Sequence, residues 1–373
     1  MIIAGIIILC YVVLMLSFVF GFDKVSSFNF SNMKRTTSFS VIIPFRNEVE
    51  RLPKLLDSIH RLNYPSENIE FIFVDDESSD NSVQLITQYL SGYDVRFSII
   101  ENVRTSNSPK KDAIQQAIQQ ATHEWIITTD ADCILPKNWL QCYNAYIQKE
   151  DVIMIAGPVK YDVENTFLET LQQVEFHTLQ GVTIGSFGIK KPMMCNGANL
   201  AYTKTAFFAV HGFEDNNSIA SGDDVFLFEK MYQLDTEKVH FLKSKAAIVT
   251  TTPEKTWKGF IEQRVRWASK SSHYRNSFTK LVGVLVALGN LTIVISFVFT
   301  IFQIFPLPFF LILFLTKVAA DVLVHLKYNQ FFIKKKKLPR YIISGFVYPF
   351  ISIFIVILTL FSGYTWKDRQ FMK

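Results

Sequence analysis

The amino-acid sequence predicts an α/β domain with a parallel, doubly wound sheet, together with one apolar helix before the domain and three after it. Short β-branched segments alternate with amphipathic helical segments over residues 39–121. Several of these segments end in acidic turns, which suits a parallel sheet because its ligands bind beyond the carboxyl ends of the strands. Four long apolar stretches, one at the start of the chain and three after residue 280, are each long enough to cross a bilayer.

The composition argues against a purely soluble protein, a nucleic-acid-binding protein and a disulfide-rich secreted protein. The chain has 373 residues, of which 49% are hydrophobic, a high fraction for a purely soluble protein. The net charge of +5 is modest, and Lys and Arg are dispersed apart from Lys334 to Lys337, so we expect no binding to nucleic acid. The four Cys residues show no ligand spacing and no disulfide framework, which fits a domain in a reducing cytoplasm.

The predicted domain organisation starts with a membrane anchor, because no signal-peptide cleavage site follows the first apolar stretch. The boundaries that we predict are 1–21 for the anchor, 22–38 for a cytoplasmic linker, 39–260 for the α/β domain, 261–280 for an interfacial helix, 281–363 for three transmembrane helices and 364–373 for a tail. This describes a multi-pass protein of the cell (inner) membrane with a cytoplasmic domain. The basic segment Lys334 to Arg340 should also be cytoplasmic, which places the basic tail outside, a mild violation of the positive-inside rule.

The stretch Trp125 to Cys133, WIITTDADC, is a short strand that ends in two carboxylates, Asp130 and Asp132. Residues two apart on an extended segment point to the same side, so both carboxylates can face one ligand. Two hard oxygen donors suit Mg²⁺ or Mn²⁺, and such an ion usually holds a diphosphate. The sequence therefore predicts a metal site at Asp130 and Asp132.

Other polar turns occur at strand ends and helix starts. The strand Ile69 to Val74 ends at Asp75 and Asp76, and a helix over Ser82 to Leu90 follows it. Lys110 lies near a helix N-terminus, where it can contact a phosphate or can simply be a solvated helix start.

A second carboxylate pair, Asp223 and Asp224, precedes the apolar helix Val225 to Met231. An Asp at a helix start is often only an N-cap, and two in a row leave one free for chemistry.

Charged residues near and within the apolar stretches have two interpretations. Gln263, Arg266 and Trp267 share one face of a predicted helix, which is also typical of an interfacial belt. Lys317 and Asp321 are i,i+4 partners inside a predicted span, where pairing lowers the cost of the charges. Lys317, Asp321 and His325 are polar residues inside a predicted membrane span, so a transporter or channel is an alternative function.

Seven motifs, taken together and in order, resemble the membrane-bound family 2 glycosyltransferases, the group with cellulose, hyaluronan and chitin synthases and the ceramide glucosyltransferases. The motifs lie between Phe39 and Lys270 and read VIIPFRNE, FIFVDDESSD, PKKDA, TTDAD, NGAN, SGDD and QRVRW. The resemblance implies a GT-A (Rossmann-like) fold, Mg²⁺ or Mn²⁺, and an inverting transfer from a nucleotide-diphosphate-sugar, with a UDP-sugar as the expected donor.

The resemblance also assigns roles on the donor side. It implies a nucleoside pocket formed by Pro44, Arg46, Glu48, Asp75 and Asp76. Lys110 matches a phosphate contact, although Pro109 stands where the family has Gly. Asp130 and Asp132 match the metal motif, with Asp132 as the direct ligand.

On the acceptor side, Asp224 matches the catalytic base, with Asp223 beside it. Gln263, Arg266 and Trp267 match the signature that closes over the donor diphosphate and packs against the acceptor. We also expect Asn196 and Gly197, in the tight turn NGAN, on the acceptor side.

The sugar and the acceptor stay open at this stage. The acceptor hydroxyl can belong to a polyprenyl phosphate, a diacylglycerol or ceramide-like lipid, or a growing polysaccharide. Four spans are few for a private polymer channel, so a processive synthase that exports its product would need a homo-oligomer or an export partner. A transporter with a nucleotide-sugar-binding domain is the alternative of another class, and the acids at three strand ends argue against it.

Overall fold

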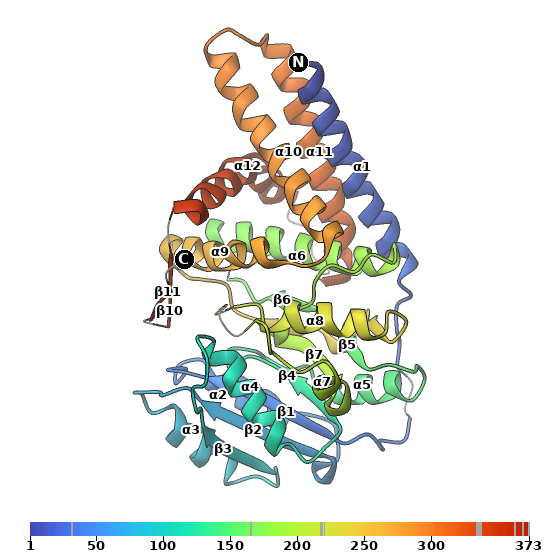
Figure 1. The fold of residues 1–373 in the computed structure, drawn as a ribbon, viewed down its shortest axis with the longest axis vertical. Coiled ribbons are helices and arrows are strands. Elements are labelled where there is room, and N and C mark those ends of the chain that lie inside the picture. Colours follow the sequence, from blue (N-terminus) through green and yellow to red (C-terminus); the bar gives the residue numbers. More distant parts are fainter. Residues whose placement is uncertain are drawn as a thin grey trace. The chain divides into compact units, whose positions relative to one another are not determined.

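The structure is a computed structural model that describes residues 1–30, 33–164, 166–216, 219, 221–332, 338–361, 363–367 and 369–371. The chain forms two compact units (Figure 1). The sheet unit consists of Ser26–Asp162 and Met194–Thr252, and the helical unit consists of Met1–Val25, Val163–Met193 and Pro253–Lys373. The predicted cytoplasmic segment Lys334 to Lys337 lies outside the described residues.

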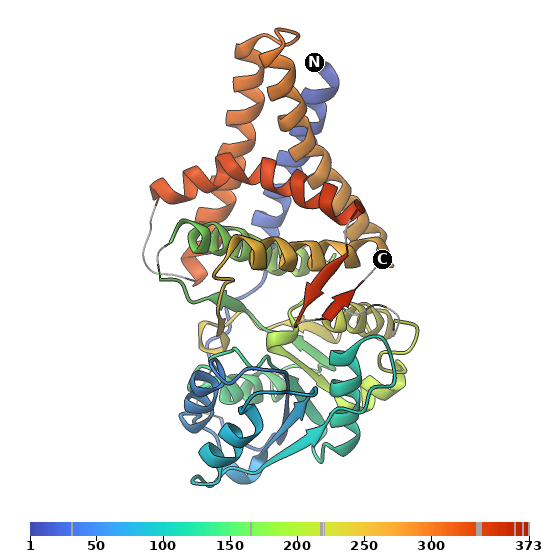
Figure 2. The same cartoon turned by 90° about the vertical axis from the view of Figure 1, so that its left-hand side faces the viewer.

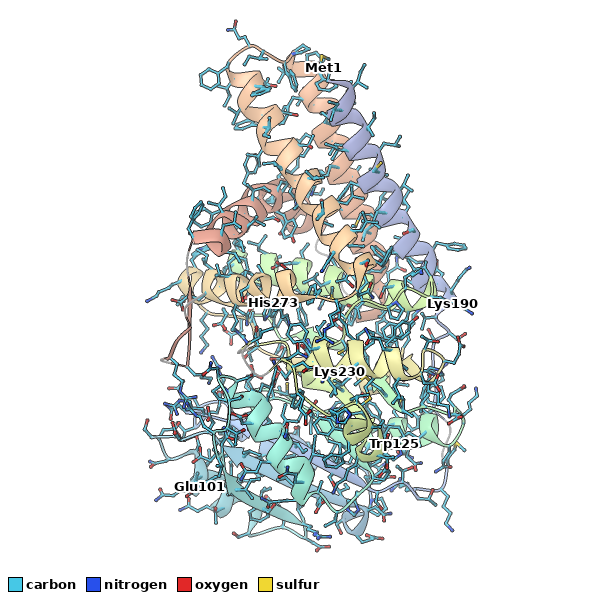
Figure 3. The ribbon with its side chains drawn as sticks, in the orientation of Figure 1. Met1, Glu101, Trp125, Lys190, Lys230 and His273 are labelled. Carbon is cyan, nitrogen blue, oxygen red and sulfur yellow. The ribbon has the colours of Figure 1, made fainter. Side chains whose placement is uncertain are left out.

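The sheet unit is built on a seven-stranded sheet with the order β3-β2-β1-β4-β7-β5-β8. Its strands are β1 (Phe39–Phe45), β2 (Ile69–Asp75), β3 (Phe97–Glu101), β4 (Trp125–Thr128), β5 (Met154–Ala156), β7 (Leu200–Thr203) and β8 (Val239–Phe241). Strands β1 to β4 run parallel to one another, as predicted, whereas β7 runs antiparallel to both β4 and β5. Figure 3 labels Glu101 at the end of β3 and Trp125 at the start of β4.

Helices connect the parallel strands, as the alternating pattern predicts. The helices of this unit are α2 (Leu52–His60), α3 (Ser82–Leu90), α4 (Pro109–Gln120), α5 (Trp139–Ile147), α7 (Lys204–Ala209) and α8 (Asp223–Leu234). Strands β1 and β2 are buried along nearly their whole length, because a central parallel strand is covered on both faces.

The sequence predicts that the strand in the segment Val152 to Val159 ends in Gly157-Pro158, and β5 does end there, at Ala156. After β5, the chain forms β6 (Val159–Tyr161), which pairs with β9 (Val249–Thr251) in a separate two-stranded sheet. Packing requires glycine at the break, because a Cβ on Gly157 would lie 2.3 Å from Nδ2 of Asn199.

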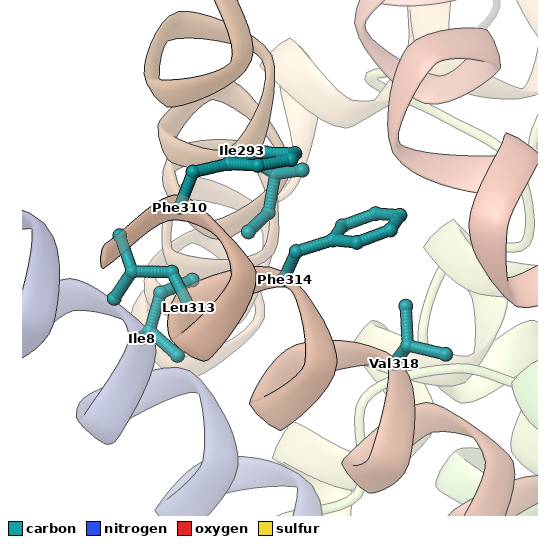
Figure 4. Packing of buried hydrophobic residues seen from close by; sticks show 6 residues of the cluster. All are labelled: Ile8, Ile293, Phe310, Leu313, Phe314 and Val318. Atoms are coloured by element: carbon teal, nitrogen blue, oxygen red, sulfur yellow. The ribbon is translucent and has the colours of Figure 1, made fainter. Parts of the chain in front are cut away.

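The helical unit holds the long apolar helices. They are α1 (Ile2–Lys24), α10 (Ser277–Ile301), α11 (Leu307–Phe332) and α12 (Leu338–Phe361). As predicted, one precedes the α/β domain and three follow it, and each is long and apolar enough to cross a membrane. Buried side chains of α1, α10 and α11 form one core (Figure 4), which contains Ile8, Ile293, Phe310, Leu313, Phe314 and Val318.

Two further helices belong to this unit, namely α6 (Phe167–Gly188) and α9 (Trp257–Ser269). The domain predicted over 39–260 includes residues 163–193 and 253–260, but in the structure these residues group with the apolar helices. The reason is the close packing of α6 on α1: a Cβ on Gly185 would lie 2.3 Å from the carbonyl oxygen of Phe18.

The segment 22–38, predicted as a linker, is divided between the two units. It continues α1 as far as Lys24, and from Ser26 onward it belongs to the sheet unit. There the N–H of Phe28 donates to the carbonyl oxygen of Lys243, and the amides of Thr36 and Thr37 donate to Oδ1 of Asn144. These hydrogen bonds attach Phe28, Thr36 and Thr37 to the sheet unit, although the segment is polar in sequence.

Candidate active site

The candidate site lies at the carboxyl edge of the parallel strands. In the register of β1 and β2, Phe45 stands opposite Asp75, and Asp75 stands opposite Glu101 of β3. Strand β4 ends at Thr128 beside β1 and leads directly into Asp130. Parallel pairing therefore brings the predicted acidic turns after β2 and β4 to one edge of the sheet, together with Glu101 at the end of β3.

Asp76 is a buried carboxylate held by cationic and amide groups. Its Oδ1 accepts hydrogen bonds from Nδ2 of Asn102 at 2.8 Å and Nε of Arg104 at 3.2 Å. Burial raises the pKa of Asp76 above its ordinary value, and the hydrogen bonds to Asn102 and Arg104 oppose this shift. Sequence reasoning missed Asn102 and Arg104, although Asn102 directly follows β3 at the same edge.

Arg46 joins the loops after β1 and β2. Its guanidinium donates to the carbonyl oxygens of Asp76 at 2.6 Å and Glu77 at 2.7 Å. Pro44 is the residue before last in β1, and Glu48 is a buried residue whose carboxylate pairs with Arg51 at 3.5 Å. The predicted nucleoside residues therefore occupy two interlocked loops.

Lys110 brings together the two carboxylate pairs. Its ammonium lies 2.8 Å from Oδ1 of Asp130 and 3.2 Å from Oδ2 of Asp223. Burial lowers the pKa of Lys110, but Asp130, Asp223 and Asp224 together raise it above its ordinary value. A cation is thus fixed between the end of β4 and the start of α8.

Pro109 does not prevent this geometry. It takes the first position of α4, where its missing N–H costs no helical hydrogen bond. The neighbouring Lys111 is buried, and its ammonium donates to the carbonyl oxygens of Asn216 and Ile219 at 2.7 and 2.8 Å. Of the two lysines, Lys110 contacts the site acids and Lys111 anchors a loop.

Asp224 is oriented by main-chain donors. Its Oδ2 accepts from the N–H of Gly197 at 3.2 Å, and its Oδ1 accepts from the N–H of Val225 at 2.8 Å. Gly222, the N-cap of α8, has a φ of 85°, a conformation that glycine adopts without strain. The turn therefore presents Asp223 and Asp224 on successive residues with different partners.

Gly197 lies close to the acids and to Lys110. A Cβ built on it would lie 3.1 Å from Oδ2 of Asp223 and 3.7 Å from Nζ of Lys110. Its carbonyl oxygen accepts from Oγ1 of Thr128, at the end of β4, at 2.7 Å. A side chain at position 197 would fill the space beside the charged groups.

The other polar residues of NGAN are structural. The side chain of Asn196 accepts from the N–H of Ala198 and caps the turn. Asn199 is fully buried and bonds to Pro158, Ala247, Trp139 and Tyr143. The structure therefore brings Gly197 to the acids through a turn that Asn196 and Asn199 hold.

The predicted metal residues lie close enough to share an ion. Ligand atoms of Asp130, Asp132 and Cys133 all lie within 4.8 Å of one another. Oδ2 of Asp132 accepts from Oγ1 of Thr251 at 3.1 Å. Burial, Asp130 and Glu48 raise the pKa of Asp132 to about 6, as expected for a buried acid beside other acids. The two carboxylates fit a hard divalent ion, and Cys133 is a buried thiol behind them.

Gln263, Arg266 and Trp267 lie on α9, in the helical unit. The Nε2 of Gln263 donates to Glu254 at 3.2 Å, and the ring of Trp267 lies 6.2 Å from that of Phe176. Between them, Arg264 is buried and pairs with Glu175 at 2.7 Å. Sequence reasoning missed this ion pair because the two residues belong to different helices.

The comparisons with known proteins agree with this architecture. The model of glycosyl transferase family 2 matches residues 40–209, and that of glycosyl transferase family group 2 matches residues 125–362, more than half of the chain. The poly-β-1,6-N-acetyl-D-glucosamine synthase of Staphylococcus epidermidis is 25% identical over 240 residues, 64% of this chain and 55% of the relative. A probable glycosyltransferase of Bacillus subtilis is 27% identical over 241 residues, 64% of this chain and 56% of the relative. The match thus spans about half the length of these relatives.

A solved structure shares the fold. It is a mannosyltransferase of Pyrobaculum calidifontis in complex with GDP-Man and Mn²⁺, with a TM-score of 0.61 and 15% identity, covering 96% of this chain and 98% of that one. The sheet order, the acids at its carboxyl edge and the two family models lead to the same conclusion. The chain belongs to glycosyl transferase family group 2 and is a family 2 glycosyltransferase with a GT-A fold.

Proposed function

We propose that the enzyme transfers a sugar, with inversion, from a nucleotide-diphosphate-sugar to a hydroxyl of a lipid or glycan acceptor. A UDP-sugar is the proposed donor. The relatives named as poly-β-1,6-N-acetyl-D-glucosamine synthases make UDP-N-acetylglucosamine the first candidate.

One observation carries the proposal: the ammonium of Lys110 bridges Asp130 and Asp223. Asp130 belongs to the pair that suits a metal-bound diphosphate, and Asp223 adjoins Asp224 on the other side of Lys110. A leaving diphosphate needs positive charge, and an attacking hydroxyl needs a base. Both requirements are met by side chains that are in contact through one lysine.

Asp224 is the proposed general base. An acceptor hydroxyl does not ionise at neutral pH, so it must lose its proton as it attacks the sugar carbon. The N–H groups of Gly197 and Val225 fix the orientation of the Asp224 carboxylate. With the base fixed, the sugar–phosphate bond breaks on the opposite face of the sugar, which inverts its configuration.

Asp130 and Asp132 are the proposed ligands of Mg²⁺ or Mn²⁺, and when bound this ion stabilises charge on the leaving diphosphate. Lys110, at the N-terminus of α4, is the proposed phosphate contact. Arg46, Asp75 and Asp76 are proposed for the nucleoside, with Arg104 added because it holds the Asp76 carboxylate. The roles of Gln263, Arg266 and Trp267 stay predictions from the resemblance.

The acceptor and the mode of action are proposed at the level of class. The polysaccharide synthases among the relatives favour a growing glycan. We propose that the enzyme is a multi-pass protein of the cell membrane whose sheet unit is cytoplasmic, where nucleotide sugars are made. Membership of a glycosyltransferase family argues against the alternative that the protein is a transporter. The intramembrane charge of Lys317, which motivated that alternative, is paired with Asp321 at 2.6 Å.

The test is an assay of the full-length protein in lipid with a panel of UDP- and GDP-sugars. We expect turnover with one donor, a product whose mass increases by one sugar or a series of sugars, and β-linkages from an α-linked donor by NMR. Retained configuration would contradict the inverting mechanism. Absence of product with every donor, on lipid and glycan acceptors alike, would contradict the proposal as a whole.

A further inference from the structure

The last apolar helix, α12, differs in direction from the other three. Figures 1 and 2 show α1, α10 and α11 running lengthwise beside one another, whereas α12 lies across them in both views. With 24 residues, α12 is about 36 Å long, enough to cross a bilayer if it ran along the others. Length and composition alone therefore do not decide whether it crosses.

The contacts of α12 change from helix to helix along its length. The ring of Phe346 lies 5.0 Å from that of Phe314 on α11. One turn later, the ring of Phe350 lies 5.6 Å from that of Phe297 on α10. A helix that ran along α11 would instead stay with α11 over several turns.

Further along, α12 leaves both spans. Ile355 packs in one cluster with residues of α6 and α9, which are Leu168, Leu171, Phe260 and Val265. Between these contacts, Oγ of Ser352 accepts from Nδ2 of Asn290 on α10 at 3.1 Å. Helix α12 thus passes from α11 over α10 to α6 and α9.

The outer face of α12 is apolar wherever its side chains are described, from Ile342 to Phe361. Large apolar side chains are exposed along α12, namely Ile343, Phe354, Ile357, Leu360 and Phe361, and Phe346 and Phe350 are partly exposed beside their contacts with α11 and α10. No charged residue occurs between Tyr341 and Gly363. A helix on the membrane surface would carry a charged face toward water, and α12 has none. Acyl chains are the environment that suits this face, since α10 and α11 expose apolar side chains beside it.

The segment after α12 returns to α9. Residues Tyr364–Trp366 (β10) and Arg369–Phe371 (β11) form an antiparallel hairpin, and β10 packs against α9. Helix α9 continues through the 3-10 turn Lys270–His273 into the first residue of α10, Ser277. The hairpin therefore lies at the end of α10 that is joined to α9, about 37 Å from the other end of this 25-residue helix.

We infer that α12 is embedded in one leaflet without crossing the membrane, with its exposed apolar face against acyl chains and the C-terminal hairpin on the side of the sheet unit. The chain then crosses three times, through α1, α10 and α11. This arrangement places Lys334 to Lys337 and the tail residues Lys367, Arg369 and Lys373 on one side, which agrees with the positive-inside rule. The four-crossing arrangement that we predicted from sequence puts the basic tail on the opposite side.

The first test compares depth along two helices in the full-length protein in lipid. Spin labels on Cys variants at Phe346, Phe350, Phe354 and Ile357 report depth from their relaxation by oxygen and by a water-soluble nickel complex. We expect nearly constant depth on α12. The control pair Val284→Cys and Ile295→Cys on α10, with the same spacing of eleven residues, should differ by up to about 16 Å. A depth gradient on α12 equal to that on α10 would overturn the inference.

The second test determines the side of the tail. In a Cys10→Ala background, an impermeant maleimide is applied to intact and to permeabilised cells that carry Lys367→Cys, Gln303→Cys or Lys238→Cys. We expect Lys367→Cys to be labelled under the same conditions as Lys238→Cys of the sheet unit. Gln303→Cys, in the α10–α11 turn, should be labelled under the opposite conditions. A fluorescent protein or alkaline phosphatase fused after Lys373 reports the same side without a need for labelling. A tail on the side of Gln303 in either experiment would overturn the inference.

Discussion

The main-chain N–H of Gly197 donates to Oδ2 of Asp224 at 3.2 Å, so a turn after α6 orients a carboxylate at the start of α8. The other oxygen of Asp224 is held by the N–H of Val225. Neighbouring Asp223 instead faces Lys110. Adjacent acids thus have separate partners, and this difference makes their roles separable by mutation.

We expect Asp224→Asn to lower kcat by about 10² to 10⁴-fold, because an amide cannot accept the proton of the acceptor hydroxyl. Donor affinity should change little, since Lys110 and the metal residues are untouched. Steady-state kinetics with varied donor and isothermal titration with UDP measure the two effects separately.

Asp223→Asn is the matched control. It removes a partner of Lys110, so it should change the KM for the donor more than kcat. If Asp223→Asn abolishes transfer and Asp224→Asn stays active, the base is Asp223 and our assignment within the pair is off by one residue. If Asp224 merely caps α8, Asp224→Asn should stay active, since Asn caps a helix about as well.

Much of this arrangement was predictable from sequence, because it depends on local rules. The helix Ser82–Leu90 has the predicted bounds, and Asp130 and Asp132 come shortly after a strand, as predicted. Both acids lie beyond the end of that strand, at Thr128, so the turn rather than the strand period brings their ligand atoms close together. The contact of Lys110 with Asp223 was not predictable, since it joins distant segments through the antiparallel strand β7 and the turn before α8. The antiparallel direction of β7 has no local signal in its four residues.

The buried polar residues show the same limit. Asn199 reads as a turn residue, yet it is fully buried and its side chain is bonded to four residues of three other segments. Its burial follows from the fit of Gly157 against its side chain, which tertiary packing alone determines. Asn102 could have been found, because it follows β3 at the edge where Asp75 ends β2.

Gly197→Ala should reduce turnover while the protein stays folded. The added Cβ would lie 3.1 Å from Oδ2 of Asp223 and 3.5 Å from Cβ of Asp224, which displaces the acids or Lys110. We expect a loss of at least about tenfold in kcat/KM, since small displacements of reacting groups are costly. Gly92→Ala is the control, because the nearest atom to its Cβ would be 4.0 Å away. Equal activity of both variants would show that the space beside Gly197 is not used.

We expect Lys110→Met to impair donor binding and Lys111→Met to impair thermal stability. Loss of the Lys110 ammonium should weaken donor binding and leave the melting temperature nearly unchanged or higher, because Lys110 serves the site acids. Loss of the Lys111 ammonium removes two buried hydrogen bonds, to the carbonyl oxygens of Asn216 and Ile219, of which that of Asn216 still accepts from the N–H of Ile219. It should cost about 1–3 kcal/mol of stability. Binding of UDP and thermal unfolding of both variants measure the contrast. A strong loss of stability in Lys110→Met with normal UDP binding would reverse our assignment.

Asp132→Asn should abolish transfer without unfolding the protein, because one of two hard ligands for the divalent ion becomes neutral. EDTA should abolish sugar transfer by the wild-type enzyme, and addition of Mg²⁺ or Mn²⁺ should restore it. Direct binding of Mn²⁺, followed by electron paramagnetic resonance, gives a readout independent of activity. Undiminished turnover of the wild type in excess chelator would rule out the metal site.

Arg264 and Arg266 lie two positions apart in QRVRW. We expect Arg264 to contribute to the stability of the fold and Arg266 to contribute to activity. Arg264 is buried, pairs with Glu175 at 2.7 Å, and lies over the rings of Phe260 and Trp267. Arg264→Met leaves the buried carboxylate of Glu175 without this cation and should lower the free energy of unfolding by about 3–5 kcal/mol. The double variant with Glu175→Leu should recover much of this loss. Arg266→Met, the signature residue, should instead lower activity with a smaller change in melting temperature. The double-mutant cycle, measured by thermal unfolding in lipid or mild detergent, gives the coupling. A coupling near zero would mean that the Arg264–Glu175 pair does not stabilise the contact of α9 with α6, and the buried position of Arg264 would then need a different explanation.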